Sequence, residues 1–238
     1  LRLVAFLKKF DAIFSLNQDL LLEHIYCNPF YFCISNIRNW DNCKSPGVQI
    51  ADSSQSNYPE NPLSRPHIPS DAPFNVEDNS QPYFKLHGSS NWHVGDEDNG
   101  LLVMGGGKEI EIGRHQLLTW YNQQFKTYMS KPDCKLMVIG YSFNDPHINK
   151  PIVDAVRTGL KLFIIDPAGV DVLDKTPPNQ LIPGKKELIE YLEPGLIGAS
   201  RRTLHSIFGD DRVEHGKLDR FMALGNGEQE LCESGLNI

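Results

Sequence analysis

The chain has 238 residues, of which 40% are hydrophobic and 22% are charged. This profile is typical of a soluble globular protein with a substantial core. Its formal net charge of −7 argues against a general nucleic-acid binder, because neutralising phosphates requires a basic face. No run reaches the eighteen or so apolar residues that a membrane span needs, and the first residues lack the order of a signal peptide.

Two helices and a short strand are predicted at the amino end. Apolar residues recur at helical spacing through residues 1–10, which indicates a helix. Residues 11–16 are typical of a short buried strand, and the polar residues 17–19 form the turn that ends it. Residues 20–26 then begin a second helix.

Residues 45–82 differ in composition from the rest of the chain. They hold seven of its sixteen prolines and are rich in Ser, Asn and Asp. Such a composition disfavours a regular hydrogen-bonded ladder, so we predict a long loop or insertion. Two interpretations stay open: a functional lid or binding loop, and a tolerated surface insertion.

The stretch FKLHGSSNW at residues 84–92 predicts a strand that ends on a histidine. A strand that only fills a core does not need an ionisable ring followed by a Gly-Ser-Ser turn. His87 therefore either sits by chance at a strand end or is carried to the rim of a pocket. Gly88 allows a close approach of the backbone at this point.

The second half of the chain predicts a strand–helix–strand unit. A helix with an apolar stripe is expected over residues 115–130, and two short apolar runs, 135–140 and 161–166, are typical of buried parallel strands. The helix between them begins either after Asp145 or near Asn149. Two more helices are expected, over 186–192 and 200–208. The fold class is therefore α/β, with a Rossmann-like parallel sheet and helices on both faces.

Polar side chains follow the predicted strands. In parallel sheets ligands bind beyond the carboxyl ends of the strands, and Asn17, Asp19, His87, Ser142 and Asp166 follow four such ends. Each residue also has a structural interpretation, since Asn and Asp commonly end strands and cap helices. All four strand ends are expected to share one edge of a single sheet, and we therefore predict a ligand site there.

Four segments resemble the motifs of the Sir2 (sirtuin) family, in the family's order. Residues 15–19 resemble Thr-Gln-Asn-Ile-Asp, residues 85–89 the catalytic His-Gly segment, residues 140–143 the Gly-Thr-Ser element, and residues 164–166 an Ile-Asn pair. The amino-acid sequences of the second and third segments are similar to those of the SIR2-like branch found in bacterial antiphage defence proteins. The resemblance runs from about residue 11 to residue 208 and implies a single SIR2-like domain over residues 1–238.

The departures from that family concern zinc, the peptide groove and the phosphate loop. The five cysteines form no Cys-x-x-Cys pair, so we expect no zinc, and an odd, scattered set suits the reducing cytoplasm. Leu16 replaces the motif Gln, and the Phe-Gly-Glu element of the acyl-peptide groove has no counterpart. The family places its Gly-rich turn upstream of Leu1, so we expect the natural chain to extend beyond that residue. The cysteines are Cys27, Cys33, Cys43, Cys134 and Cys232.

The resemblance implies cleavage of the nicotinamide–ribose bond of NAD. His87 would be the general base, Asn17 would hold the attacking water or the ribose, and Asp19 would stabilise positive charge or order the ribose. Asp166 would bind the adenosine ribose and Ser142 a phosphate or ribose, with Ser15 and Gly140 also expected to contact NAD.

Three functions follow from what accepts the ADP-ribose. With water the protein is an NAD hydrolase, which the missing zinc module and groove favour. With an acyl-lysine it is a deacylase, and with no acceptor it is an NAD- or ADP-ribose-sensing module. We expect a homo-oligomer or an additional sensor or effector domain as partner, and neither nucleic acid nor membrane.

Overall fold

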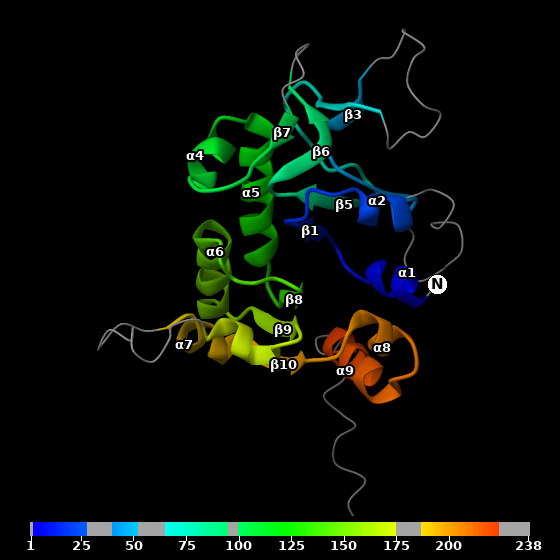
Figure 1. Ribbon diagram of the computed structural model, residues 1–238, viewed down its shortest axis with the longest axis vertical. Helices are drawn as coiled ribbons and strands as arrows, with labels where there is room; N and C mark the ends of the chain where they lie inside the picture. The colour runs from blue at the N-terminus through cyan, green and yellow to red at the C-terminus, as the bar shows by residue number, and fades with distance from the viewer. Residues whose placement is uncertain (1, 28–39, 52–64, 95–99, 175–186, 224–238) are drawn as a thin grey trace, which may run out of the picture. The chain divides into compact units, whose positions relative to one another are not determined.

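A computed structural model describes residues 2–27, 40–51, 65–94, 100–174 and 187–223 (Figure 1). The chain divides into two compact units, Leu1–Phe125 and Lys126–Ile238, and each is described by itself. In the described ranges we find no helix with both the length and the apolar character that crossing a membrane requires.

The first sheet of the amino-terminal unit is parallel and has β5 at its centre. Its strand order is β1-β5-β2, with β1 at Ile13–Ser15, β5 at Ser80–Lys85 and β2 at Asn42–Lys44. Pairing with β1 continues beyond the ladder, because Leu86 N donates to Ser15 O at 2.9 Å. The expected helices at the amino end are present as α1 (Arg2–Leu7) and α2 (Leu21–Ile25).

The two faces of β5 pack on different elements, because side chains alternate along a strand. One face carries Phe84, whose ring meets two aromatic rings of α5 (Gln116–Met129), those of Trp120 and Tyr121, at 5.9 and 5.0 Å between centroids. The other face carries Gln81, which donates to the carbonyl oxygens of Leu7 and Phe10 at 2.9 and 2.8 Å. All six residues of β5 are buried, so this strand forms the core of the unit.

A second sheet in the same unit has the order β3-β4-β6-β7. Its strands are β3 (Val48–Ile50), β4 (His67–Pro69), β6 (Gly88–His93) and β7 (Gly100–Leu102), and the six-residue helix α4 (Lys108–Gly113) follows. The pairs β3/β4 and β6/β7 are antiparallel, whereas β4/β6 is parallel.

The prediction of a loop without regular structure over residues 45–82 is wrong for its described part. Residues 48–50 and 67–69 are paired strands, and β5 begins at Ser80. Proline is tolerated here because Pro69 ends its strand, while Pro82 pairs with Lys44, the last residue of β2. Residues 52–64 lie outside the described residues.

The carboxy-terminal unit is built on the parallel sheet β10-β9-β8. Figure 1 shows α6 and α7 on one side of these strands and α8 and α9 on the other. Phe163 of β9 contacts Phe221 of α9 at 5.6 Å between ring centroids. The elements are β8 (Lys135–Ile139), α6 (Pro146–Arg157), β9 (Lys161–Ile165), α7 (Leu188–Leu192), β10 (Leu196–Ser200), α8 (Leu204–Phe208) and α9 (Arg212–Ala223), with 3₁₀ turns at Gly169–Leu173 and Glu193–Gly195.

The predicted strand–helix–strand unit is confirmed as β8-α6-β9. Of the two predicted helix starts, the one after Asp145 is confirmed, because α6 begins at Pro146 and proline fits the first helical position, where no N–H is needed. The strands that were expected to form one sheet are paired within two separate units, β1 with β5 and β8 with β9.

Candidate functional site

The stretch around His87 is a bend that carries the chain from one sheet to the other. β5 ends at Lys85, and β6 of the second sheet starts at Gly88. Gly88 has a φ of +77°, and a Cβ on it would lie 2.0 Å from the carbonyl oxygen of Leu101. The predicted close approach of the backbone at Gly88 is thus confirmed.

His87 lies in the interior of this bend. Only 3% of the residue is exposed, and its carbonyl oxygen accepts a hydrogen bond from Val103 N at 2.9 Å. A buried imidazole needs hydrogen-bond partners for its ring nitrogens, so burial alone does not separate a structural role of His87 from a catalytic one.

The loop that follows β1 is tied to the His87 bend through Gln18. The side-chain Nε2 of Gln18 donates to Val103 O at 2.6 Å. The backbone carbonyl oxygen of Gln18 accepts from Ser90 N at 2.9 Å. The backbone of Val103 therefore joins the two segments: its N–H donates to His87, and its carbonyl oxygen accepts from Gln18. The structure brings the Asn17–Asp19 loop and the His87 bend into one hydrogen-bonded assembly.

Asn17 and Asp19 are both exposed on that loop. Asp19 Oδ1 accepts from Leu21 N at 2.9 Å, so this carboxylate binds the N–H of the first residue of α2, whose N-cap position is Leu20. Ser15 Oγ accepts from Asn17 N at 3.1 Å. One Asp19 oxygen and the Ser15 hydroxyl thus shape the loop, and the Asn17 amide lies at the surface.

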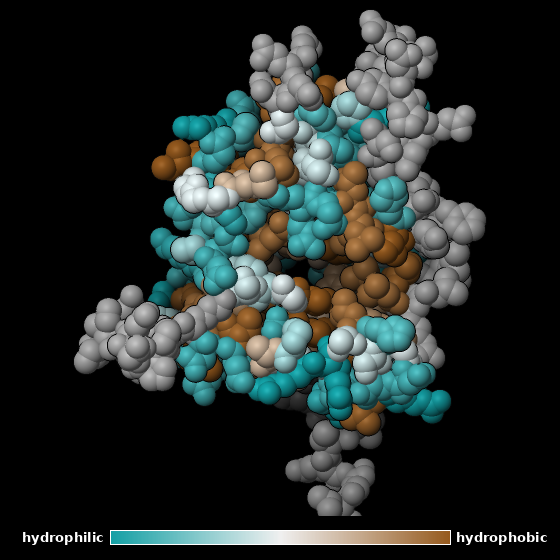
Figure 2. Space-filling view, viewed as in Figure 1, coloured by the Kyte–Doolittle hydropathy of each residue, from teal (hydrophilic) through white to brown (hydrophobic). Residues whose placement is uncertain are grey.

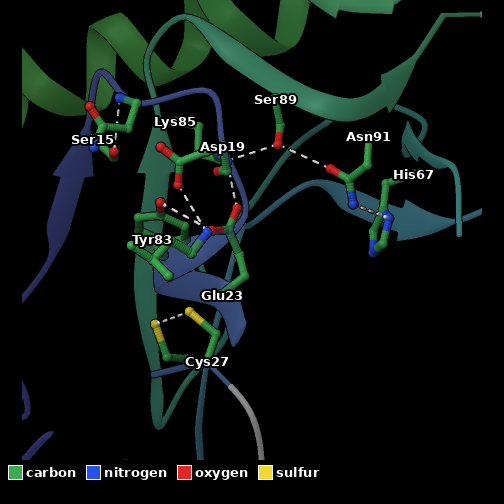
Figure 3. A network of polar contacts seen from close by, with 12 residues as sticks. Ser15, Asp19, Glu23, Cys27, His67, Tyr83, Lys85, Ser89 and Asn91 are labelled. Atoms are coloured by element: carbon green, nitrogen blue, oxygen red, sulfur yellow. Dashed lines mark hydrogen bonds and ion pairs between the residues drawn. The ribbon is translucent and has the colours of Figure 1, made fainter. Parts of the chain in front are cut away.

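A network of buried polar groups supports the same loop (Figure 3). Lys85 Nζ, on a side chain with no exposed surface, pairs with Glu23 Oε1 at 2.6 Å and donates to Ser89 Oγ at 2.8 Å. The network continues from Ser89 to Asn91 at 3.0 Å and from Asn91 to His67 at 3.1 Å. Burial lowers the pKa of His67, so its ring is held in the neutral form near neutral pH.

Sequence reasoning missed Gln18 and Lys85 as site residues. Gln18 lies between two residues that were singled out, and Lys85 directly precedes Leu86 and His87. The one available signal was a lysine inside an otherwise apolar run, which a buried strand carries only when its charge is paired.

In the carboxy-terminal unit, Gly140 and Ser142 lie on the loop that follows β8. Gly140 has a φ of +61° with no atom within 4 Å of a built Cβ, and both residues are exposed. The loop is held by Phe143, a buried residue with a φ of +54°, and by Asn149, whose Nδ2 donates to Phe143 O at 2.8 Å. Such backbone strain in a non-glycine residue is typical of functional loops.

Asp166 follows β9, at the same edge of this sheet as the Gly140 loop. Its backbone N–H donates to Ser200 O at 3.0 Å, and its Oδ1 accepts from Ala168 N at 2.8 Å. This turn fixes the carboxylate at the carboxyl end of a parallel strand, where ligands bind in open α/β sheets. Its second oxygen has the chemistry to accept a hydrogen bond from a ribose hydroxyl.

The seven predicted site residues therefore form two sets. Ser15, Asn17, Asp19 and His87 belong to the amino-terminal unit, and Gly140, Ser142 and Asp166 to the carboxy-terminal unit. Every member lies in or directly after a strand that pairs in parallel, or on the loop that follows one.

A protein-family model described as SIR2-like domain matches residues 11–179. The match starts just before β1 and extends past β9, so it contains both sets of residues. No curated protein matches the sequence.

Proposed function

The chain belongs to the SIR2-like domain family, whose model matches well over half of it, and from this premise we propose that it hydrolyses NAD at the nicotinamide–ribose bond. SIR2-like domains use NAD, and the family is generally enzymatic. The observation that supports this function is the pairing of the Asn17 loop with the His87 bend through Val103 and Gln18. These hydrogen bonds join the loop that carries the Asn17 amide to the bend that carries the His87 imidazole.

The proposed reaction needs a leaving group, a nucleophile and a base. The bond between ribose C1′ and the nicotinamide nitrogen breaks, and its electron pair goes to the nicotinamide ring. A water oxygen bonds to C1′, and the ring of His87 takes up the proton that the water loses, a task suited to imidazole at neutral pH. Asn17 orients that water or the ribose hydroxyls, because its amide both donates and accepts hydrogen bonds.

The remaining residues are proposed to hold the rest of NAD. Asp166 would accept from the adenosine ribose hydroxyls, and Ser142 would donate to a phosphate or ribose oxygen. Gly140 would let NAD approach the backbone at this edge of the sheet, because the residue is exposed and the space around its Cβ position is open. Asp19 would favour the positive charge that develops on the ribose, while Ser15 keeps the Asn17 backbone in place.

Deacylation of an acyl-lysine peptide is the second candidate function, and one observation favours it. β7 is an edge strand of its sheet among the described residues, and edge strands accept peptides by strand addition. Beyond it Met104 and Ile110 are 68% and 70% exposed, and Figure 2 shows apolar atoms at the surface over α4. Water is the preferred acceptor because paired cysteines for zinc and the Phe-Gly-Glu element of the acyl-peptide groove are missing from the sequence.

The test is nicotinamide release by the full-length protein, with NAD alone and then with an acetyl-lysine peptide added. Release with NAD alone, in step with ADP-ribose formation, supports the hydrolase. Release that requires the peptide supports the deacylase. Tight NAD binding without release under either condition supports a sensing module. Elemental analysis of the same sample is expected to find no stoichiometric zinc.

A further inference from the structure

Lys85 is the last residue of the buried strand β5. Its side chain is fully enclosed, and that of its partner Glu23 is only 12% exposed. We propose that Lys85 is the positioning residue that holds the Asn17–Asp19 loop in register with the His87 bend. The consequence for catalysis rests on the proposed function, whereas the consequence for the loop does not.

The ammonium group of Lys85 has an acceptor for each of its three N–H bonds. They are the backbone carbonyl of Asp19, the Glu23 carboxylate at 2.6 Å and the Ser89 hydroxyl at 2.8 Å. All the donors are thus used within the protein, so Lys85 acts on a substrate through the groups that it holds.

The three acceptors come from three different segments. Asp19 belongs to the loop after β1, Glu23 to α2, and Ser89 to β6, next to Gly88 of the bend. Figure 3 shows the Lys85 side chain among them. One buried charge therefore fixes both ends of the assembly, the loop that carries Asn17 and the bend that carries His87.

Stability alone does not account for an ion pair at this position. Taking a lysine and a glutamate out of water costs about as much as their attraction returns, and apolar residues of similar size often replace such pairs without loss. An apolar side chain would fill the same volume but would leave the Asp19 carbonyl without its donor. The specific contribution of Lys85 is the position of that carbonyl, two residues from Asn17.

The variant that isolates this contribution is Lys85→Met with Glu23→Gln. Lys85→Met alone leaves a buried carboxylate without its counter-charge and can fail to fold. The double variant removes both charges together and keeps side chains of similar size. The matched control is Lys135→Met, since Lys135 also donates to two backbone carbonyls, those of Phe221 and Met222, at 3.1 and 3.0 Å.

The first readout is steady-state NAD cleavage by the full-length variants. Because misplacing a reacting group by about 1 Å can cost on the order of a hundredfold, we expect kcat of the folded double variant to fall about a hundredfold. Its KM for NAD should move less than its kcat, since the Gly140 loop and Asp166 are untouched. Lys135→Met should keep the wild-type kcat. A folded double variant with wild-type kcat would overturn the inference.

The second readout is amide hydrogen exchange, which needs no activity. Loss of the Lys85 anchor should speed exchange at least tenfold in residues 16–22 and at Ser90, whose N–H bonds to Gln18 O, and leave β8 and α6 unchanged. If the wild-type protein releases no nicotinamide, the proposed function fails while this measurement still decides the role of Lys85. Unchanged exchange in residues 16–22 would overturn that role even in an active enzyme.

Discussion

Gly88 approaches Leu101 so closely that a Cβ on Gly88 would lie 2.0 Å from the Leu101 carbonyl oxygen. The contact lies where β6 begins to pair with β7, opposite Leu102. It also fixes the residue next to His87 against a backbone atom, which cannot move aside as a side chain can. The bend that buries His87 thus depends on the absence of a side chain at Gly88.

Gly88→Ala is expected to lower the free energy of unfolding far more than Gly105→Ala. Both glycines have a φ of +77°, but a Cβ on Gly105 meets no atom within 4 Å. Gly105→Ala therefore measures only the left-handed backbone, about 1–2 kcal/mol. Gly88→Ala adds the clash with Leu101 and should cost about 4 kcal/mol or more, as measured by urea unfolding of the full-length proteins.

Equal losses in these two variants would contradict this view of the bend. They would mean that β7 moves away from Gly88 at little cost. In that case the position of His87 would not depend on the close contact between β6 and β7.

The carboxy-terminal sheet was the most predictable part of the fold. β8 and β9 were identified because buried parallel strands consist of continuous apolar runs, and residues 162–165 are all buried. The helix between them was recognised by its apolar spacing, with Ile148, Ile152 and Val156 buried. Long, periodic elements carry their own signal in the sequence.

The short strands were not predictable for the opposite reason. β2, β3, β4 and β7 have three residues each, too few to show a period of two. Their pairing depends on partners distant in the sequence, as in the register of Asn42 with Ser80, and strand preference depends strongly on such context. Proline-rich composition therefore suggested a loop where the chain forms ladders.

The position of the proposed reactive residues was predictable from the sequence, but the residues that support them were not. Asn17 and His87 follow strands, a place where ligands bind, and the structure ties their segments together. Lys85 and Gln18 were missed because a charged or amide side chain is normally taken for an exposed position. Only the tertiary structure shows that Glu23 lies within reach of the Lys85 ammonium.

The thiols of Cys27 and Cys43 lie 3.2 Å apart, and we expect oxidised glutathione to join them in a disulfide. One thiolate attacks glutathione disulfide and releases a glutathione thiolate, and the second then displaces the other glutathione. Burial raises the pKa of Cys43, so its thiolate is scarce at pH 7 and the bond should form faster at pH 9. Peptide mapping by mass spectrometry measures the product.

Cys27→Ser is the control for this pair, since it should abolish the linked peptide. Cys134, half-buried in the other unit, is expected to appear as a mixed disulfide with glutathione. A map in which Cys27 is joined mainly to a cysteine other than Cys43 would contradict the observed proximity.

The ionised carboxylate of Glu214 is expected to stabilise the fold, and acid should remove this contribution. Hydrogen bonds from Lys217 and Ser200 lower the pKa of Glu214 below its ordinary value of 4.5. A carboxyl with a lowered pKa adds stability above pH 4.5, and this stability is lost as the pH falls through the lowered pKa. Glu214→Gln should therefore cost about 2 kcal/mol at pH 7 and almost nothing near pH 2.

The measurement is urea unfolding at several pH values, with Glu193→Gln as the control because Glu193 is exposed. The control should follow the wild-type curve throughout. A difference between Glu214→Gln and wild type that stays constant from pH 7 to pH 2 would show that the Ser200–Glu214–Lys217 contacts do not depend on the carboxylate charge.

Asn17→Ala should abolish most NAD cleavage without destabilising the protein. The residue is exposed, so its replacement should change the free energy of unfolding by no more than about 0.5 kcal/mol. If its amide orients the water or ribose, kcat should fall by about a hundredfold, a typical cost of losing a positioned group. Asn75→Ala, at another exposed position in the same unit, should keep full activity.

His87 needs a different design, because only 3% of it is exposed and truncation leaves a cavity. His87→Gln keeps a polar side chain of similar size, whereas His87→Ala removes it. Loss of a general base typically costs a hundred- to ten-thousand-fold, so both variants should lose nicotinamide release by at least a hundredfold, including His87→Gln at wild-type stability. His24→Ala, which removes an exposed histidine of α2, is the control. Wild-type turnover in a folded His87→Gln protein would reduce His87 to a structural residue of the bend and would transfer the search for the base to other groups.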